Sequence, residues 1–297
     1  MAAWPVGHAS VAVVAVRPES GRAPGAGPVA TSELLGSVGS PERAYPWASV
    51  TKPATALAVL VAYEEGSLDL DEPAGPPGST VRHLLCHASG LGPEPGPPMG
   101  APGANRIYSN AGYTVLADLL EERTGMSFAA YLRVGVLDPL GMGHTTLGAD
   151  ALAAAAGLAG PLVDLVALGG ELASPTLISD ETHRAAVSSQ FPDLGGVLPG
   201  FGWFQPCPWG LGVEIRGDKQ PHWTGTTNSP ETFGHFGRSG SFLWVDPVAG
   251  LLCAGLADRQ FGPWATRTWP RLADAVLLEA APHPPLRAEP GHPADPR

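Results

Sequence analysis

Residues 46–70 read PWASVTKPATALAVLVAYEEGSLDL, and this stretch decides how the rest of the chain is arranged. From residue 54 to residue 63 almost every side chain is apolar, and Gly66 stands where a helix would end. A helix that is apolar on every side has to be buried, so this stretch predicts a central helix in the core. Pro53 is tolerated only near the first turn of a helix, which places Ser49 at the helix entrance.

Segments typical of β-strands lie at both ends of the chain, on either side of a mainly helical middle. The N-terminal strands are expected at 11–16 and 29–38, separated by the turn-rich stretch 18–27. Four later strands, joined by short turns, predict an antiparallel meander; they span 211–216, 231–236, 241–245 and 251–256. Helices are expected at 81–87, 112–124, 128–136, 161–172, 181–189 and 264–280.

This order of elements predicts an α+β fold, an antiparallel sheet flanked by helices with an inserted, mainly helical region. We expect residues 1–66 and 191–281 to form one discontinuous sheet domain and residues 67–190 to form the helical region. The Pro-rich tail, residues 282–297, is expected to be disordered.

Composition narrows the class of protein. The 297 residues are 44% hydrophobic, so a large core is possible, and the formal net charge of −11 makes nucleic acid an unfavourable partner. The N-terminus MAAWPVGHAS lacks the features of a secretory signal, and the longest apolar stretch is too short to span a bilayer. Three cysteines without a CxxC pair suit free thiols. We therefore expect a cytoplasmic protein with no membrane partner.

The first candidate for chemistry is the pair Ser49 and Lys52. On a helix, residues three apart lie on one face, so the Lys52 amine can reach the Ser49 hydroxyl. A buried lysine with a lowered pKa can take the proton of a serine and make it a nucleophile. The chain has one other lysine, Lys219, and we expect Lys52 to be the only buried one. The alternative is a helix-capping serine followed by a solvated lysine, because S-x-x-K is common by chance.

The second candidate group is Tyr108-Ser109-Asn110, which precedes the helix expected at 112–124. A phenol beside Lys52, partly ionised, is able to act as general base and to return the proton to a leaving group. Asn110 can donate a hydrogen bond to a substrate carbonyl, or it can cap the helix that begins there. For Tyr108 the alternative is a tyrosine half-buried in a turn.

The third candidate group is His235-Phe236-Gly237 on an expected strand, followed by Arg238. Gly237 permits close approach of a substrate to the strand edge, and a backbone N–H there can complete an oxyanion hole. Taken alone, His235 would be an ordinary strand histidine.

These three groups occur in one order, S-x-x-K, then Y-S-N, then H-x-G, and in that order the chain resembles the serine β-lactamase-like or penicillin-binding superfamily. Its members include class C β-lactamases, family VIII carboxylesterases and DD-peptidases. The connecting segments resemble those of the same superfamily; they are VRHLLCHASGL at 81–91, DPLGM at 138–142 and GHFGRSGSFLWVDP at 234–247. The resemblance covers roughly residues 10–280.

The resemblance implies a nucleophile at Ser49, with proton transfer shared by Lys52 and Tyr108, and substrate contacts from Asn110, His235, Gly237 and Arg238. It further implies an oxyanion hole made by the N–H groups of Ser49 and Arg238. His235 stands where β-lactamases usually keep a lysine, which weakens a fixed positive charge for a substrate carboxylate. Arg238 can replace that charge if it points into the site.

Other motifs are set aside. His83, Cys86 and His87 have metal-like spacing, but no second cluster completes a ligand set, so no metal and no cofactor are expected. The chain has no G-x-S-x-G nucleophile elbow. The Gly- and Pro-rich loop at 92–103 is either a lid over the site or a plain connector.

Three hypotheses for function remain. The preferred one is a serine hydrolase that acts through an acyl-enzyme on Ser49, a carboxylesterase for small acyl esters. The second is a β-lactamase or a D-aminopeptidase/DD-peptidase with the same site, for which Arg238 would anchor the substrate carboxylate. The third is a non-catalytic relative that binds a small ligand in the cleft, although such a module does not need a Ser-Lys-Tyr set. Small-molecule esters, amides or lactams are therefore the expected partners.

Overall fold

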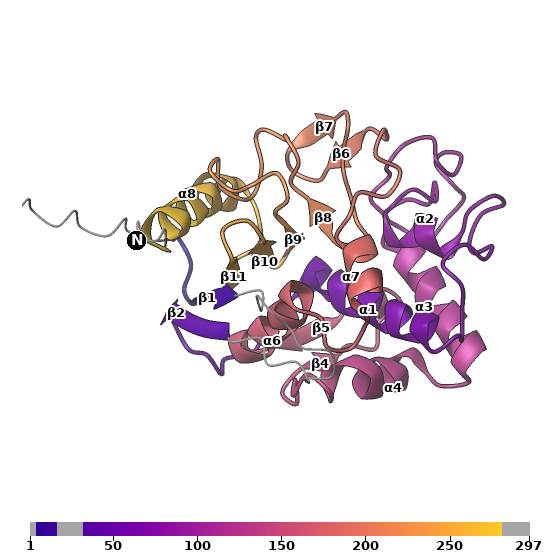
Figure 1. Ribbon diagram of the computed structural model, residues 1–297, viewed down its shortest axis with the longest axis horizontal. Helices are drawn as coiled ribbons and strands as arrows, with labels where there is room; N and C mark the ends of the chain where they lie inside the picture. The colour runs from indigo at the N-terminus through magenta and orange to yellow at the C-terminus, as the bar shows by residue number, and fades with distance from the viewer. Residues whose placement is uncertain (1–3, 17–31, 281–297) are drawn as a thin grey trace, which may run out of the picture.

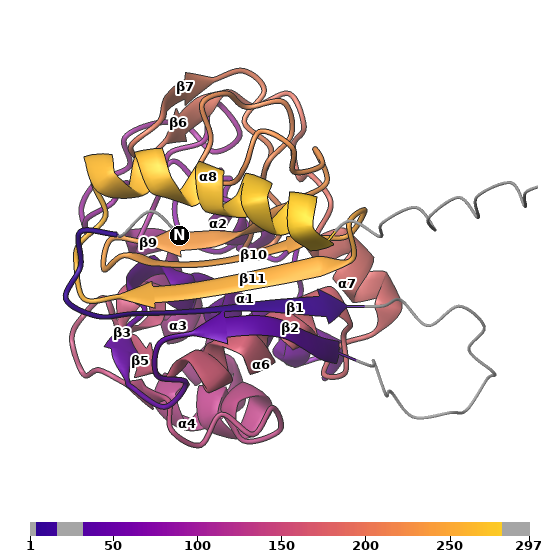
Figure 2. The same ribbon diagram turned by 90° about the vertical axis from the view of Figure 1, so that its left-hand side faces the viewer.

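The computed structural model describes residues 4–16 and 32–280, and its centre is an antiparallel sheet of six strands in the order β2-β1-β11-β10-β9-β8. The N-terminal strands pair with the C-terminal meander, because β1 lies between β2 and β11. Figure 2 shows these strands side by side. The strands are β1 (Ala9–Val16), β2 (Ser32–Val38), β8 (Glu214–Ile215), β9 (Phe233–Gly237), β10 (Ser241–Asp246) and β11 (Leu251–Ala257).

Helices cover both faces of the sheet. Helix α8 (Pro263–Ala280) crosses one face, while α1 (Thr51–Glu64) and α6 (Leu162–Ala173) lie against the other (Figure 2). Side chains of β10 alternate between the two faces, so Trp244 packs in the cluster below α8 and Leu243 in the cluster around α1. The inner strands β9, β10 and β11 are therefore buried on both sides, whereas every residue of the edge strand β2 is exposed.

Several of the remaining helical pieces pack around α1 (Figure 1). The helical pieces are η1 (Ala48–Val50), α2 (Val81–Leu85), α3 (Ala111–Thr124), α4 (Phe128–Leu132), η2 (Arg133–Leu137), α5 (Ala153–Ala156) and α7 (Asp180–Ala186). Strands β3 (Tyr45–Pro46), β5 (Leu158–Gly160) and β4 (Thr146–Leu147) form a small second sheet. Strands β6 (Gly196–Leu198) and β7 (Gly202–Phe204) form a hairpin at the top of Figure 1.

The predicted fold class is confirmed, including the buried helix and the antiparallel meander. Three details differ. The strand predicted at 211–216 is paired only at Glu214–Ile215, since Gly212 turns there with φ +96° to pass close to Ala56. The helix predicted at 128–136 widens into a π-turn at Arg133–Leu137. The hairpin β6–β7 and the small sheet were not predicted.

Two predicted segments and one predicted division of the chain remain expectations from the sequence. The turn-rich stretch 18–27 and the tail 282–297 lie outside the described residues, and the division into two domains stays a prediction. No helix among the described residues is long and apolar enough to cross a bilayer. The three cysteines are buried free thiols, as expected.

Candidate active site

Ser49 lies on a single tight turn that is locked against strand β9. The turn η1 precedes α1, and the residue before the serine, Ala48, has a left-handed φ of +46°. The Ser241 hydroxyl donates a hydrogen bond of 2.6 Å to the Trp47 carbonyl of this turn. A Cβ on Gly237 would lie 2.3 Å from that same carbonyl oxygen, so only glycine allows β9 to approach the turn. The sheet thereby fixes the position of the candidate nucleophile.

Lys52 is fully buried, and its amine contacts the serine one turn earlier. Lys52 Nζ lies 3.4 Å from Ser49 Oγ, 2.7 Å from Asn110 Oδ1 and 3.0 Å from the Ala155 carbonyl oxygen. Burial lowers the pKa of Lys52 well below its ordinary value. A neutral amine has two hydrogens, and the amide and carbonyl oxygens accept both. The nitrogen lone pair then remains for the Ser49 hydroxyl, which is the arrangement of a base beside its nucleophile.

The Tyr108 side chain completes the group. Lys52 Nζ lies 4.7 Å from the centre of its ring. Burial raises the pKa of Tyr108, and the nearby Ser49 hydroxyl opposes this only in part. Burial thus opposes the partly ionised phenol expected from the sequence and favours a protonated Tyr108 beside Lys52.

Of the two roles that the sequence left open for Asn110, the helix-capping role belongs to Ser109. Asn110 is the first residue before α3, but its side chain makes no capping hydrogen bond and accepts one from Lys52 instead. Ser109 takes the capping role, because its hydroxyl oxygen accepts a 2.8 Å hydrogen bond from the N–H of Gly112.

His235 is buried on β9 beside this group, with its ring centre 6.0 Å from that of Tyr108. Its Nδ1 lies 2.8 Å from the Phe236 carbonyl oxygen and must carry the hydrogen of that bond. Burial, and then Lys52 whenever its amine is protonated, lower the pKa of His235 to about 3. At neutral pH the imidazole is uncharged, and its Nε2, which has no partner among the described residues, offers a hydrogen-bond acceptor.

These residues line a cavity of about 840 Å³. The walls are mainly apolar, and three exposed side chains stand at its edge: Met99 (68% exposed), Val197 (50%) and Trp203 (57%). Met99 comes from the Gly- and Pro-rich loop, and the other two come from the β6–β7 hairpin. Arg238 lies in the same lining with an exposed side chain. The structure thus brings Ser49, Tyr108, Asn110, His235 and Arg238 to one cavity, with Lys52 beneath the serine.

Sequence reasoning missed a buried ion pair under this cavity. Glu214 lines the cavity, and its carboxylate lies 2.7 Å from Lys219 Nζ, with both side chains 1% exposed. The same carboxylate accepts hydrogen bonds from His222 Nε2 at 3.0 Å and Trp223 Nε1 at 2.9 Å. The expectation that Lys52 is the only buried lysine is therefore wrong. The one signal in the sequence that could have indicated this ion pair is Lys219 itself, because the chain has only two lysines.

The metal-like spacing on α2 is accounted for, at His83, by other contacts. His83 Nδ1 lies 2.8 Å from the Thr80 hydroxyl, and its ring stacks on Phe191. Within residues 4–16 and 32–280 no three His, Cys, Asp or Glu side chains are grouped to hold a metal ion.

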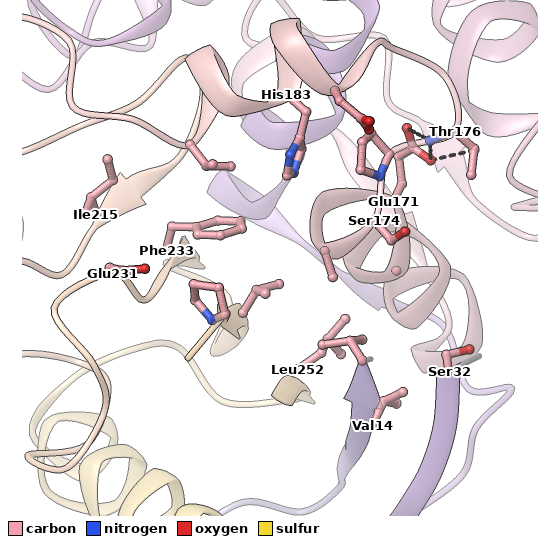
Figure 3. A pocket seen from close by; sticks show the side chains of 18 of the residues that line it. Val14, Ser32, Glu171, Ser174, Thr176, His183, Ile215, Glu231, Phe233 and Leu252 are labelled. Carbon is pink, nitrogen blue, oxygen red and sulfur yellow. Dashed lines mark hydrogen bonds between the residues drawn. The ribbon is translucent and has the colours of Figure 1, made fainter. Parts of the chain in front are cut away.

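A second cavity, of about 1150 Å³, lies between α6, α7 and the sheet (Figure 3). Its floor is apolar, and Glu171 at its wall uses its carboxylate to accept hydrogen bonds from the Thr176 and Leu177 N–H groups and the Thr176 hydroxyl. It contains no counterpart of the serine, lysine and tyrosine, so the catalytic candidates belong to the smaller cavity.

Comparisons with known proteins agree with this geometry. The family model described as Beta-lactamase matches residues 39–278. A beta-lactamase from Mycobacterium bovis is 47% identical, with a TM-score of 0.86 over 93% of this chain and 96% of that one. The hydrolase EstCE1, described with promiscuous acyltransferase activity, is 17% identical with a TM-score of 0.72 over 92% and 94% of the two chains, which shows the fold.

Curated relatives are more distant and longer. A Salmonella enteritidis protein that carries the name D-alanyl-D-alanine carboxypeptidase is 27% identical over 223 residues, 61% of this chain and 51% of its own length. Penicillin-binding protein 4* of Bacillus subtilis is 30% identical over 131 residues, 33% of this chain and 29% of its own. The chain therefore spans about half the length, or less, of the curated relatives it matches.

Proposed function

This chain belongs to the beta-lactamase family, and we propose that it is a serine hydrolase that forms an acyl-enzyme on Ser49 and cleaves small, uncharged carboxylic esters. One observation carries the proposal: the buried Lys52 amine lies 3.4 Å from Ser49 Oγ while two other oxygens accept its hydrogens. That arrangement leaves the amine lone pair for the serine proton.

The proposed reaction has two proton transfers in its first half. Lys52 takes the hydroxyl proton as Ser49 Oγ bonds to the ester carbonyl carbon, and the carbonyl oxygen becomes an oxyanion beside the Ser49 and Arg238 N–H groups. When the carbon–oxygen bond to the alcohol breaks, neutral Tyr108 donates its proton to the departing oxygen, and Lys52 returns a proton to the phenol. Water then attacks the acyl-enzyme by the same steps and releases the acid.

The preference for uncharged esters rests on the cavity walls. His235 offers a bare nitrogen acceptor where a cation would be needed to hold a carboxylate, so a carboxylate gains nothing from it. Apolar side chains at the entrance, Trp203 among them, favour an aliphatic or aromatic acyl group. Asn110, with its Oδ1 facing Lys52, keeps its amide N–H₂ for a substrate carbonyl.

The second candidate is a β-lactamase or DD-peptidase with the same nucleophile. It is favoured by the exposed Arg238 in the cavity lining, whose guanidinium could hold a substrate carboxylate, and by the 47% identity to the M. bovis protein. For either candidate a cytoplasmic location stays a proposal from the sequence.

The test uses p-nitrophenyl acetate and butyrate, nitrocefin and a fluorophosphonate probe with the wild type and Ser49→Ala. We expect ester turnover that Ser49→Ala abolishes, an intact-mass adduct on the wild type alone, and slower turnover of nitrocefin. Ester turnover that survives Ser49→Ala would disprove the acyl-enzyme. Nitrocefin cleavage faster than ester cleavage would select the second candidate, and absence of any adduct would select the non-catalytic relative.

A further inference from the structure

His87 holds the chain on both sides of Tyr108. Its backbone carbonyl accepts a hydrogen bond of 3.0 Å from the N–H of Ile107, and its ring nitrogen Nδ1 accepts one of 3.1 Å from the N–H of Ser109. The imidazole also lies against the phenol ring, with the ring centres 4.6 Å apart. One residue thus holds the backbone on both sides of Tyr108, and among the described residues it makes no hydrogen bond to Ser49 or Lys52.

The backbone of His87 is in an unfavourable conformation. Its φ is +61°, in the left-handed region that costs a non-glycine residue about 1–2 kcal/mol. This conformation follows the end of α2 at Leu85, and the ring is enclosed by Tyr108, Tyr113 and Trp209. A strained residue of this kind persists where the surrounding structure needs the side chain in that place.

The hydrogen bonds of His87 also define its protonation. Because Nδ1 accepts from a backbone N–H, the hydrogen of the neutral ring is on Nε2. Burial, and then the Lys52 charge, lower the pKa of His87 well below its ordinary value, which agrees with a neutral ring. Nε2 is buried without a partner among the described residues, a cost of about 1–3 kcal/mol. Stability alone does not account for a side chain that is both strained and incompletely hydrogen-bonded.

We propose that His87 is a positioning residue, which directs the Tyr108 hydroxyl toward Ser49 by holding residues 107 and 109. The inference rests on the proposed function, in which Tyr108 protonates the leaving group. His87 acts through Tyr108 and does not contact the reacting atoms, so its contribution disappears when Tyr108 has no hydroxyl to place.

A double-mutant cycle tests this coupling. His87→Gly and His87→Asn both tolerate the left-handed backbone, but only asparagine supplies an oxygen able to accept the Ser109 N–H. Each is made in the wild type and in Tyr108→Phe, and kcat and KM for p-nitrophenyl butyrate are measured with the melting temperature of every variant. We expect His87→Gly to lower kcat about 100-fold with KM changed less than about threefold. In Tyr108→Phe the same change should lower kcat less than about threefold, and His87→Asn should recover at least about tenfold over His87→Gly.

Equal losses of kcat in the two backgrounds would overturn the proposal, as would His87→Asn no more active than a folded His87→Gly. If His87→Gly does not fold, the same cycle is measured with His87→Asn. The smaller fall in kcat that His87→Asn causes in the wild type must then also vanish in the Tyr108→Phe background. The proposed function fails separately, when Ser49→Ala keeps its turnover or Tyr108→Phe has wild-type kcat. One result refutes the positioning role but keeps the proposed function. In it, turnover depends on Ser49, Tyr108→Phe lowers kcat, and the kcat losses of the His87 and Tyr108 substitutions are additive.

Discussion

Replacing Glu214 with glutamine should destabilise the protein strongly at neutral pH. The carboxylate lies 2.7 Å from Lys219 Nζ, with both side chains nearly inaccessible to water, and it also accepts hydrogen bonds from His222 and Trp223. A neutral amide leaves the Lys219 ammonium buried without a counter-charge. Removing one partner of a buried ion pair typically costs about 3–5 kcal/mol.

The pKa of Glu214 gives an independent magnitude. Burial raises the pKa of this carboxyl, but the His222 and Lys219 side chains outweigh burial and lower it from 4.5 to about 2. A folded pKa near 2, against 4.5 in the unfolded chain, corresponds to roughly 3 kcal/mol of stability at neutral pH. Because the folded pKa is depressed, this stabilisation is fully present above pH 4.5 and is lost as the pH falls toward 2.

Urea unfolding, followed by tryptophan fluorescence, measures the difference between wild type and Glu214→Gln at several pH values. We expect the free energy of unfolding of the wild type to exceed that of Glu214→Gln by about 3 kcal/mol at pH 7. This gap should narrow below pH 4.5, by at most about 1.4 kcal/mol per pH unit. The matched control is Glu122→Gln, whose carboxylate pairs with Arg123 and whose side chain is 70% exposed, so it should leave the unfolding midpoint unchanged. A gap below about 1 kcal/mol at pH 7, or one that stays constant down to pH 3.5, would refute the reasoning.

Three further predictions concern the site. Lys52→Met should slow fluorophosphonate labelling of Ser49 at least about 100-fold without lowering the melting temperature, because it removes the base and also a buried amine; labelling at the wild-type rate would exclude Lys52 as the base. His235→Lys should raise the ratio of nitrocefin to ester turnover about tenfold or more, since it places a cation where the neutral imidazole stands. An unchanged ratio in a folded variant would show that a side chain at position 235 does not contact the carboxylate of nitrocefin. Gly237→Ala should lower the free energy of unfolding by about 1–3 kcal/mol and remove most of the activity, because its Cβ would lie 2.3 Å from the Trp47 carbonyl oxygen. The control Gly36→Ala on β2 has open space around it and should be neutral in urea unfolding and in ester turnover. Equal effects of the two substitutions would contradict the close approach of β9 to the turn that carries Ser49.

The sequence predicted those parts of the site that depend on local geometry. Ser49 and Lys52 are three residues apart on one helical turn, so their contact follows from helix geometry alone. The buried helix followed from its uniform apolar composition. Gly237 was predicted to permit a close approach, although the group that approaches it is the Trp47 carbonyl oxygen.

The sequence did not predict the long-range contacts on which the proposed proton-transfer roles of Lys52 and Tyr108 depend. The Ala155 carbonyl that accepts from Lys52 is 103 residues away and presents no side-chain signature, since any residue has a carbonyl. The partner of Lys219 is a glutamate on a strand only two residues long. The β6–β7 hairpin was missed because each strand is only three residues long, and because exposed positions carry apolar side chains, Val197 and Trp203, where the usual alternation predicts polar ones.

The assignment of base and acid depends on these distant contacts. Burial shifts the pKa values of both Lys52 and Tyr108, lowering the first and raising the second. The directions differ because the charged form is the protonated one for the amine and the deprotonated one for the phenol. The same apolar surroundings therefore make the amine a better proton acceptor and the phenol a proton donor. A residue pattern of Ser, Lys and Tyr is compatible with either assignment. The burial of α1 by the surrounding helices is what favours Lys52 as the proposed acceptor of the Ser49 proton.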